Sequence, residues 1–294
     1  MGAKVATAPD SWGVWFPRDA RQVPWRRFLD EVVAAEYEAI ELGPFGYLPT
    51  DARTLDAELG ARGLRLTGGT MAGAFADAAA LDGLLRQTER ICRLISALGA
   101  QFLVLLPATY TDLFSGEVVG PHELDDVAWQ RMIQALERIG SIARECGVLA
   151  LFHPHAQSVV ETETVIERLL ADTDPGGLGL CLDLGHHAYA RGEPVGFLRD
   201  HAPRIPYLHL KNVDGAVVER VMAENLPFAR AVELGVMCTL DRGAIDYGQV
   251  RDVLDAIGFD GWAVVEQDMY PAPEGMPLIC ARQNRRLLQR VGIG

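Results

Sequence analysis

Polar side chains that can act as metal ligands or proton carriers occur in pairs at the ends of apolar runs. In each pair the two residues are two positions apart: His153 and His155, His209 and Lys211, and Glu266 and Asp268. Because side chains two apart on an extended strand point to the same face, each run directs two such groups to one side. We therefore expect the three pairs to contribute to one site.

Two further runs end in similar groups, with Asp183 followed by His186 in one and Glu41 in the other. A lone buried histidine is more often a hydrogen-bonded core residue than a ligand, and an aspartate after a strand often caps the next helix. Burying so many ionisable groups without partners would be costly, however, and a divalent metal bound by imidazoles and carboxylates removes that cost. We expect a structural role for His187, and surface positions for His122 and His201.

The elements that would position these groups alternate along the chain. Eight apolar runs occur, at 4–9, 39–43, 64–69, 102–107, 148–155, 178–186, 205–212 and 262–268, and stretches with helical spacing lie between them, such as 25–37, 81–100, 123–147 and 161–172. Alternating strands and helices predict parallel pairing through crossover helices, and apolar runs without polar alternation predict strands buried on both faces. Eight such units predict an α/β fold with one closed (β/α)₈ TIM barrel, whose active groups collect at the C-terminal ends of the strands.

An open doubly wound sheet is the alternative fold. It would normally carry a glycine-rich phosphate-binding turn after the first strand, and the segment APDSWGVW has none. We therefore expect residues 1–294 to form a single barrel domain, with an enlarged connection at 214–243 before the eighth strand and a C-terminal helix at 278–291.

Composition excludes several classes of function. The formal net charge of −13 and the absence of a basic block argue against a nucleic-acid partner. No apolar run is long enough to cross a membrane, and the first residues do not resemble a signal peptide. The five cysteines are odd in number and widely spaced, as is typical of reduced thiols in a cytoplasmic protein.

The stretches LFHPHAQ, CLDLGHHAYARG, PYLHLKNV and GWAVVEQD resemble the xylose-isomerase-like barrel superfamily of sugar isomerases and epimerases, and most closely the inosose dehydratases. The resemblance covers most of the chain. It implies a divalent metal, with Mn²⁺ expected before Co²⁺, Zn²⁺ or Mg²⁺, held by four side chains: His153, Asp183, His209 and Glu266. It also implies a small sugar or cyclitol as substrate and a possible homodimer.

Two positions depart from the superfamily pattern. Most of its sugar epimerases have glutamate where this chain has His153, whereas inosose dehydratases have a histidine-rich stretch there. Asn212 stands where the dehydratases tend to have aspartate. Epimerisation by two bases needs a proton carrier on each face of the substrate. Glu266 is the glutamate that remains beside the expected metal, so this reaction would need a second carrier from elsewhere in the chain. A 1,2-shift or β-elimination of water needs only one base.

The resemblance implies an isomerase or epimerase that removes the α-proton of a keto-inositol or keto-sugar and passes through a metal-stabilised enediolate. Glu266 would be the base, and Lys211, His155 and His186 would stabilise charge or move protons. Five residues are expected to contact substrate: Glu41, Trp12, Trp15, Tyr47 and Asp268.

Four other functions stay open. They are an inosose dehydratase-type lyase, a lyase that cleaves C-glycosides of 3-keto-sugars, a non-catalytic sugar-binding barrel, and a metal-dependent DNA-repair endonuclease on the same fold. The endonuclease would need a basic face, which the acidic composition argues against. No phosphate cradle is visible in the sequence, so a neutral keto-polyol is the expected substrate.

Overall fold

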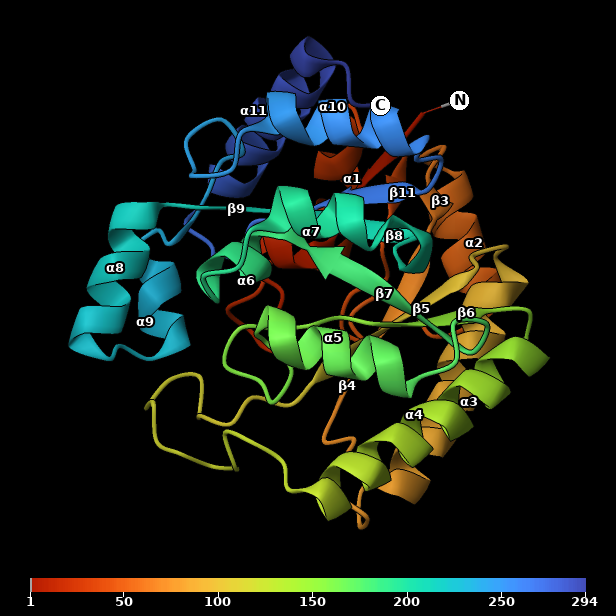
Figure 1. Cartoon of the computed structure of the whole chain (residues 1–294). Coiled ribbons are helices and arrows are strands. Elements are labelled where there is room, and N and C mark those ends of the chain that lie inside the picture. Colours follow the sequence, from red (N-terminus) through yellow and green to blue (C-terminus); the bar gives the residue numbers. More distant parts are fainter. Residues whose placement is uncertain (1) are drawn as a thin grey trace.

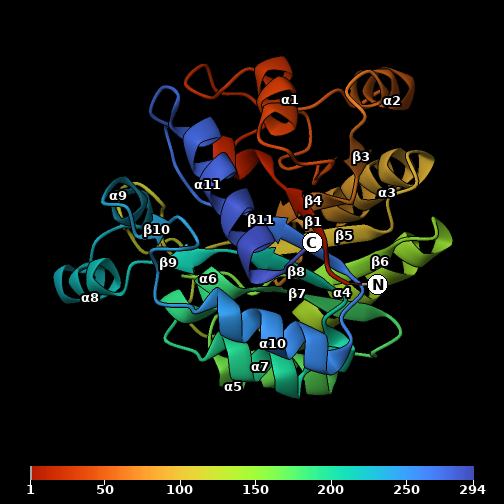
Figure 2. The same ribbon diagram turned by 90° about the horizontal axis from the view of Figure 1, so that it is seen from above.

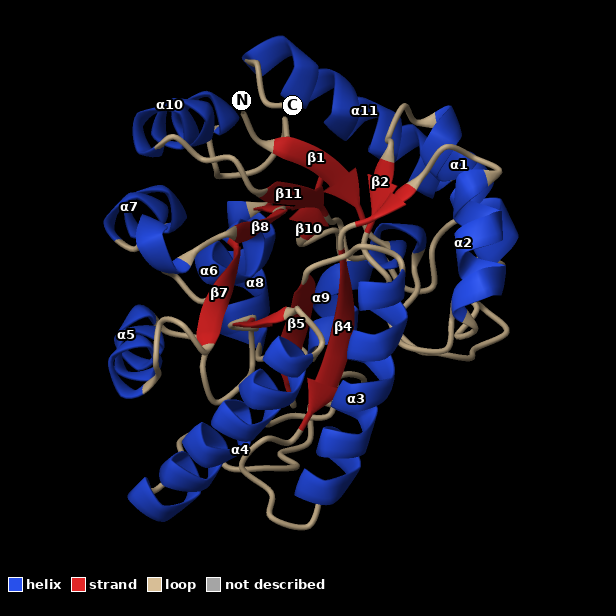
Figure 3. Cartoon of the chain, turned by 90° about the vertical axis from the view of Figure 1, so that its right-hand side faces the viewer, coloured by secondary structure: helices blue, strands red, loops and turns tan. Residues whose placement is uncertain are grey.

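The computed structural model describes residues 2–294, in which nine strands form one parallel sheet that curves into a barrel (Figure 3). The order of the strands is β3-β2-β1-β11-β8-β7-β6-β5-β4. Their bounds are β1 Lys4–Thr7, β2 Ala39–Ile40, β3 Arg65–Leu66, β4 Gly68–Gly73, β5 Phe102–Pro107, β6 Leu149–Phe152, β7 Leu178–Asp183, β8 Tyr207–Leu210 and β11 Trp262–Val265.

The nine strands fill the eight barrel positions that the sequence predicts, because β3 and β4 are two halves of one position. The β3 half pairs with β2 and the β4 half pairs with β5. Beyond β2, the Leu42 N–H donates to the Gly68 carbonyl at 3.0 Å, and a parallel bridge joins Pro44 to Thr70. These contacts close the barrel, so the predicted barrel is confirmed.

The helices surround the sheet (Figures 1 and 2). Their bounds are α1 Trp25–Ala34, α2 Ala52–Gly60, α3 Leu81–Ala97, α4 Asp126–Glu145, α5 Glu163–Asp172, α6 Leu184–Tyr189, α7 Pro194–Asp200, α8 Gly215–Glu224, α9 Phe228–Glu233, α10 Tyr247–Ile257 and α11 Met276–Val291, with short 3₁₀ turns η1 Pro9–Trp12 and η2 Ala202–Arg204. Helix α3 packs closely on β4, because a Cβ on Gly69 would lie 2.8 Å from the Ile91 side chain. Burial of these apolar helix faces is the main force that holds the barrel together.

The barrel interior is filled by small and medium side chains that come from seven of its strands and from the residue after β1: Ala6, Ala8, Ala39, Val104, Leu151, Cys181, Tyr207 and Val264. Tyr207 is the largest of them, and its hydroxyl hydrogen-bonds to Thr67 at 2.7 Å and to Glu41 at 2.9 Å. The interior is therefore a packed core, and the Tyr207 hydroxyl links it to the carboxylate of Glu41.

The segment 214–243 contains α8 and α9, which project from one side of the barrel (Figure 1). A two-stranded antiparallel ladder, β9 Asn212–Val213 with β10 Met237–Cys238, joins its two ends. The fully buried Asn212 side chain donates to the Leu240 and Ile245 carbonyls and accepts from the Val213 and Ile245 N–H groups. Asn212 thus fastens the segment to the barrel.

We expect Asn212→Asp to destabilise the fold by about 3 kcal/mol, because it leaves two buried carbonyls without donors and places a carboxylate beside them. Urea unfolding at neutral pH measures the change. Asn212→Ser, which removes the amide without adding charge, should cost less. Equal stability of wild type and Asn212→Asp would contradict this role.

No helix within residues 2–294 is both long and apolar enough to cross a membrane.

Candidate active site

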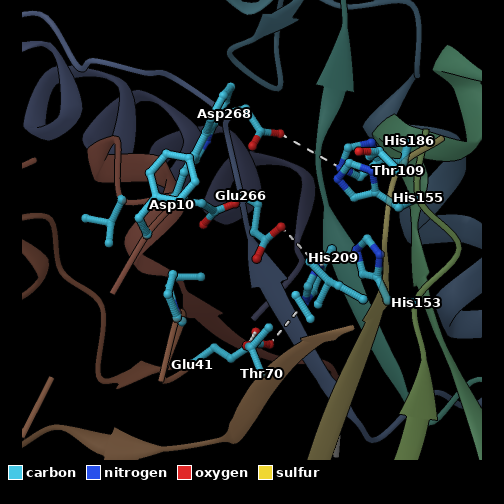
Figure 4. Close-up of a pocket in the computed structure, with 18 of the residues that line it drawn as sticks. Asp10, Glu41, Thr70, Thr109, His153, His155, His186, His209, Glu266 and Asp268 are labelled. Carbon is cyan, nitrogen blue, oxygen red and sulfur yellow. Dashed lines mark hydrogen bonds and ion pairs between the residues drawn. The ribbon is translucent and has the colours of Figure 1, made fainter. Parts of the chain in front are cut away.

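A cavity of about 550 Å³ opens at the C-terminal ends of the barrel strands (Figure 4). Nine residues predicted from the sequence to belong to the site line this cavity: Trp15, Glu41, His153, His155, His186, His209, Lys211, Glu266 and Asp268. Asp183 lies directly beside it and is buried. The structure thus brings together residues that are up to 253 positions apart in the chain and that come from six of the barrel positions.

Parallel strands place the four predicted metal ligands at one level. His153 directly follows β6, Asp183 ends β7, His209 lies in β8 opposite Asp183, and Glu266 directly follows β11. Asp183 also caps α6, because its Oδ1 accepts the His186 N–H at 2.8 Å. Its other oxygen, Oδ2, faces the remaining ligands.

The four side chains direct donor atoms at one point. His209 Nδ1 lies 3.1 Å from His153 Nε2, 3.0 Å from Glu266 Oε2 and 3.7 Å from Asp183 Oδ2, and His153 Nε2 lies 3.5 Å from Asp183 Oδ2. A divalent metal with bonds of about 2.1 Å separates neighbouring ligand atoms by roughly 3.0–3.4 Å. The four residues therefore fit such an ion.

The proton on His209 is fixed by Glu41. His209 Nε2 donates to Glu41 Oε2 at 3.0 Å, and the same carboxylate accepts from the Tyr207 hydroxyl at 2.9 Å and from the Thr70 hydroxyl at 2.5 Å. A carboxylate behind a histidine is the usual partner of a metal-binding imidazole, because it leaves the lone pair of the other nitrogen free. Here that nitrogen is Nδ1, which faces the three other ligands.

Cys181 offers a competing set with His153 and His209. That set contains no carboxylate, and burial raises the pKa of the Cys181 thiol to about 12. The set with Asp183 and Glu266 supplies two negative charges to a divalent ion and suits it better.

Lys211 is a fully buried cation at the edge of this set. Its Nζ lies 2.8 Å from Asp268, 3.0 Å from Asp183 and 3.1 Å from Glu266. Burial alone would lower the pKa of Lys211, but these carboxylates outweigh it and raise that pKa well above the ordinary value. Burial likewise opposes ionisation of Glu266, yet His209 and Lys211 hold its pKa below the ordinary value.

The rings of His155 and His186 lie against each other with their centroids 3.8 Å apart and their planes tilted by 38°. Burial lowers the pKa of His155 to about 3 and that of His186 well below its ordinary value, and the Lys211 cation adds to both shifts. His155 Nδ1 donates to the Ala156 carbonyl, and His186 Nε2 accepts from Lys211 Nζ at 3.1 Å. Both rings are therefore neutral imidazoles beside the metal set.

The structure adds Asp10 to the site. It follows β1, lines the cavity and lies 4.0 Å from Lys211. Burial and the nearby Glu266 raise the pKa of Asp10 well above its ordinary value. The sequence contains a signal for Asp10, because this residue directly follows the first apolar run.

Trp12 and Tyr47, expected to contact substrate, are not among the cavity-lining residues within 2–294. Trp12 is fully buried, packs edge-on against Phe28 and donates to Glu31 at 2.8 Å. Tyr47 donates to the Val23 carbonyl at 2.8 Å. Both satisfy their polar atoms in the core, which is the common fate of a large aromatic side chain in a well-packed barrel.

The remaining histidines lie outside the cavity, as expected. His187 bonds to Glu163 at 2.9 Å, His201 lies 3.6 Å from Glu167, and His122 is exposed.

Comparison with known proteins agrees with the closed barrel. The family model described as "Xylose isomerase-like TIM barrel" matches residues 29–285. This chain belongs to that family. Family membership confirms the resemblance drawn from the strand-end motifs.

Curated relatives include an inosose dehydratase of Geobacillus thermodenitrificans, 28% identical over 277 residues that cover 92% of this chain and 91% of that protein. An inosose dehydratase of Lacticaseibacillus casei is 28% identical over 281 residues, covering 92% of each. Among solved structures, a probable 3-DHS dehydratase of Bacillus anthracis has a TM-score of 0.73 at 17% identity and covers 98% of this chain and 99% of that one. A D-psicose 3-epimerase of Clostridium cellulolyticum has a TM-score of 0.72 at 14% identity, covering 99% and 100%.

We expect Glu41→Gln to weaken the affinity for a divalent metal about tenfold to a hundredfold, because an amide is a poorer acceptor for the His209 N–H. Competition with a fluorescent chelator measures the metal Kd. Thr70→Val, which removes one hydrogen bond to Glu41 but not its charge, should have a smaller effect. An unchanged Kd in Glu41→Gln would show that His209 does not need this partner.

Proposed function

We propose that the protein is a divalent-metal-dependent lyase that removes water from a keto-cyclitol or keto-sugar after abstraction of the α-proton. The observation that carries this proposal is the separation of proton carriers in the cavity. Figure 4 shows the carboxylates Glu266, Asp268 and Asp10 on one side and the neutral imidazoles of His155 and His186 on the other. The names of the curated relatives, inosose dehydratases, support the same class of reaction.

A divalent metal bound by His153, Asp183, His209 and Glu266 would supply a Lewis acid that polarises the substrate ketone. Glu266, held ionised by the Lys211 ammonium 3.1 Å away, takes the α-proton. Lys211 is a cation at this stage and stabilises the negative charge that develops on the substrate oxygen.

The imidazole side of the cavity then assists the leaving hydroxyl. His186 accepts from Lys211 through Nε2, so its Nδ1 carries a hydrogen. When this hydrogen passes to the leaving hydroxyl to form water, the ring takes up a proton from Lys211 Nζ through Nε2. Lys211 then recovers a proton from Glu266, whose Oε2 lies 3.1 Å from Nζ, so that the α-proton and the hydroxyl leave together as water. The His155 ring packs against His186. A carboxylate base with a nearby imidazole acid is the pair of groups that elimination of water requires.

Isomerisation or epimerisation is the first expectation from the resemblance. It would begin with the same removal of the α-proton by Glu266, but the substrate would be rearranged without loss of water. The histidine at position 153 favours elimination, because an imidazole that holds the metal through Nε2 is not free to serve as a second base, whereas the superfamily resemblance implies a carboxylate there in epimerases.

Incubating the protein with 2-keto-myo-inositol and Mn²⁺, followed by mass spectrometry and NMR, separates the two reactions. We expect a product lighter by one water molecule, formed with metal and not after chelation. A product of unchanged mass with a new configuration or carbonyl position would replace the lyase by an isomerase. No reaction of 2-keto-myo-inositol or of common keto-hexoses would reject the proposed substrate class.

A further inference from the structure

The two halves of the cavity differ in chemistry. The polar lining comes mainly from the barrel strands and the residues that follow them. The loops and α9 contribute large apolar side chains, which we call the apolar collar: Trp15, Phe16, Phe45, Leu113 and Phe228. The collar is built from the connections after β1, β2 and β5 and from the enlarged segment 214–243.

Packing holds the collar in place. The Trp15 ring stacks on Tyr270 with centroids 4.8 Å apart and lies 6.0 Å from the Phe228 ring. The Leu113 carbonyl accepts the Ala229 N–H at 2.8 Å, which ties the loop after β5 to α9. The collar is thus a formed surface that several connections support.

Hydroxyl groups would find few partners at the collar. Apart from the ionisable strand-end residues and Thr70, the side chains with a hydroxyl, amide or charged group that line the cavity within residues 2–294 are Thr109, two residues after β5, and Gln87 on α3. The indole N–H of Trp15 is itself buried. Thr109 already donates its hydroxyl hydrogen to the Thr111 carbonyl at 2.8 Å. Because a desolvated hydroxyl without a partner is costly, a polyol ring suits the strand ends and not the collar.

The cavity also has room for more than one polyol ring. Its volume of about 550 Å³ falls within the range of roughly 300–1,000 Å³ that is typical of pockets for drug-sized ligands. A six-carbon keto-polyol is smaller than such ligands. Phe228 spans the boundary, since its ring lies 5.7 Å from His155 and 5.9 Å from His186.

We propose that the substrate is a keto-sugar or keto-cyclitol that carries a planar apolar substituent, and that the collar binds this substituent while the strand ends bind the ring. The proposal rests on the proposed function for the identity of the ring. Recognition of the substituent is a binding event of its own and is testable without turnover.

The test compares two ligands that lack a ketone and cannot react: methyl β-D-glucopyranoside and benzyl β-D-glucopyranoside. Titration calorimetry of the Mn²⁺-loaded protein measures both values of Kd. Burial of a phenyl ring predicts that the benzyl ligand binds about tenfold to a hundredfold more tightly. Equal affinities, or no measurable binding of the benzyl ligand, would overturn the proposal.

Variants locate the effect. Phe228→Ala and Trp15→Ala should each reduce the ratio of the two Kd values, and Phe228→Leu, which keeps apolar bulk, should retain most of it. Phe114→Ala is the matched control, because Phe114 belongs to the same aromatic cluster but does not line the cavity; it should keep the wild-type ratio. Circular dichroism of each variant verifies folding.

The ratio also separates this proposal from the lyase proposal. Phe228→Ala and Trp15→Ala could instead weaken the binding of both ligands by the same factor. The two aromatic rings would then stack on the sugar itself, and the collar would not recognise the substituent. This conclusion does not depend on whether keto-polyols react. If the ratio of the two Kd values changes as expected but no keto-polyol loses water, the result supports binding of the substituent by the collar and rejects the proposed reaction.

Discussion

Changing Glu266 to glutamine should lower kcat/KM by about a thousandfold or more. General base catalysis alone contributes roughly 10²- to 10⁴-fold, and Glu266 also supplies one of the two negative charges of the predicted metal set. The amide has nearly the same shape, so cavity packing is preserved. Initial rates of water loss from 2-keto-myo-inositol at saturating Mn²⁺ measure the change.

Two controls make the Glu266→Gln result specific. The metal content of the variant, measured by elemental analysis, separates loss of the base from loss of the ion. Glu163→Gln removes a partly exposed carboxylate that pairs with His187 outside the cavity, and it should keep the wild-type rate. A metal-loaded Glu266→Gln protein with more than a tenth of wild-type activity would exclude Glu266 as the base.

Changing Asp183 to asparagine should weaken binding of a divalent metal by more than about a hundredfold, beyond the effect typical of residues that only support a ligand. Asparagine caps helices as well as aspartate does, so the cap on α6 is retained while the charge on Oδ2 is lost. Competition with a chelator measures the metal Kd, and thermal unfolding without metal measures whether the fold is retained.

The matched control for Asp183→Asn is Asp246→Asn, which makes the same change at the cap of α10, on an exposed residue away from the predicted metal set. That variant should bind metal as the wild type does. If Asp183→Asn also binds metal with wild-type affinity, the four-residue set is not the metal site, and the set with Cys181 becomes the one to test.

The barrel and the strand-end residues were predictable because each depends on a repeating pattern. Eight apolar runs identify the barrel positions, and a period of two along a strand places His209 and Lys211 on one cavity. Topology then brings the strand ends together whatever their distance in sequence. The split of the third position into β3 and β4 was not predictable, because the switch of pairing partners at Thr67 depends on neighbouring strands.

The loop-borne part of the site was only partly predictable. Trp15 and Trp12 are three residues apart, yet one lines the cavity and the other is buried beside Phe28. Sequence spacing does not separate them, because the turn η1 and the packing of α1 decide their directions. Phe228 was not predictable from the sequence, since only the folded position of 214–243 places the Phe228 ring beside His155 and His186.

The central claim is that Glu266 removes an α-proton from a polyhydroxy ketone that a divalent metal bound at the strand ends would polarise. Proton NMR of 2-keto-myo-inositol in D₂O tests it most directly, with wild-type protein after chelation, after reloading with Mn²⁺, and with reloaded Glu266→Gln. We predict that deuterium enters substrate or product only with the reloaded wild type. Exchange at the same rate in the chelated protein, or in Glu266→Gln, would contradict the account.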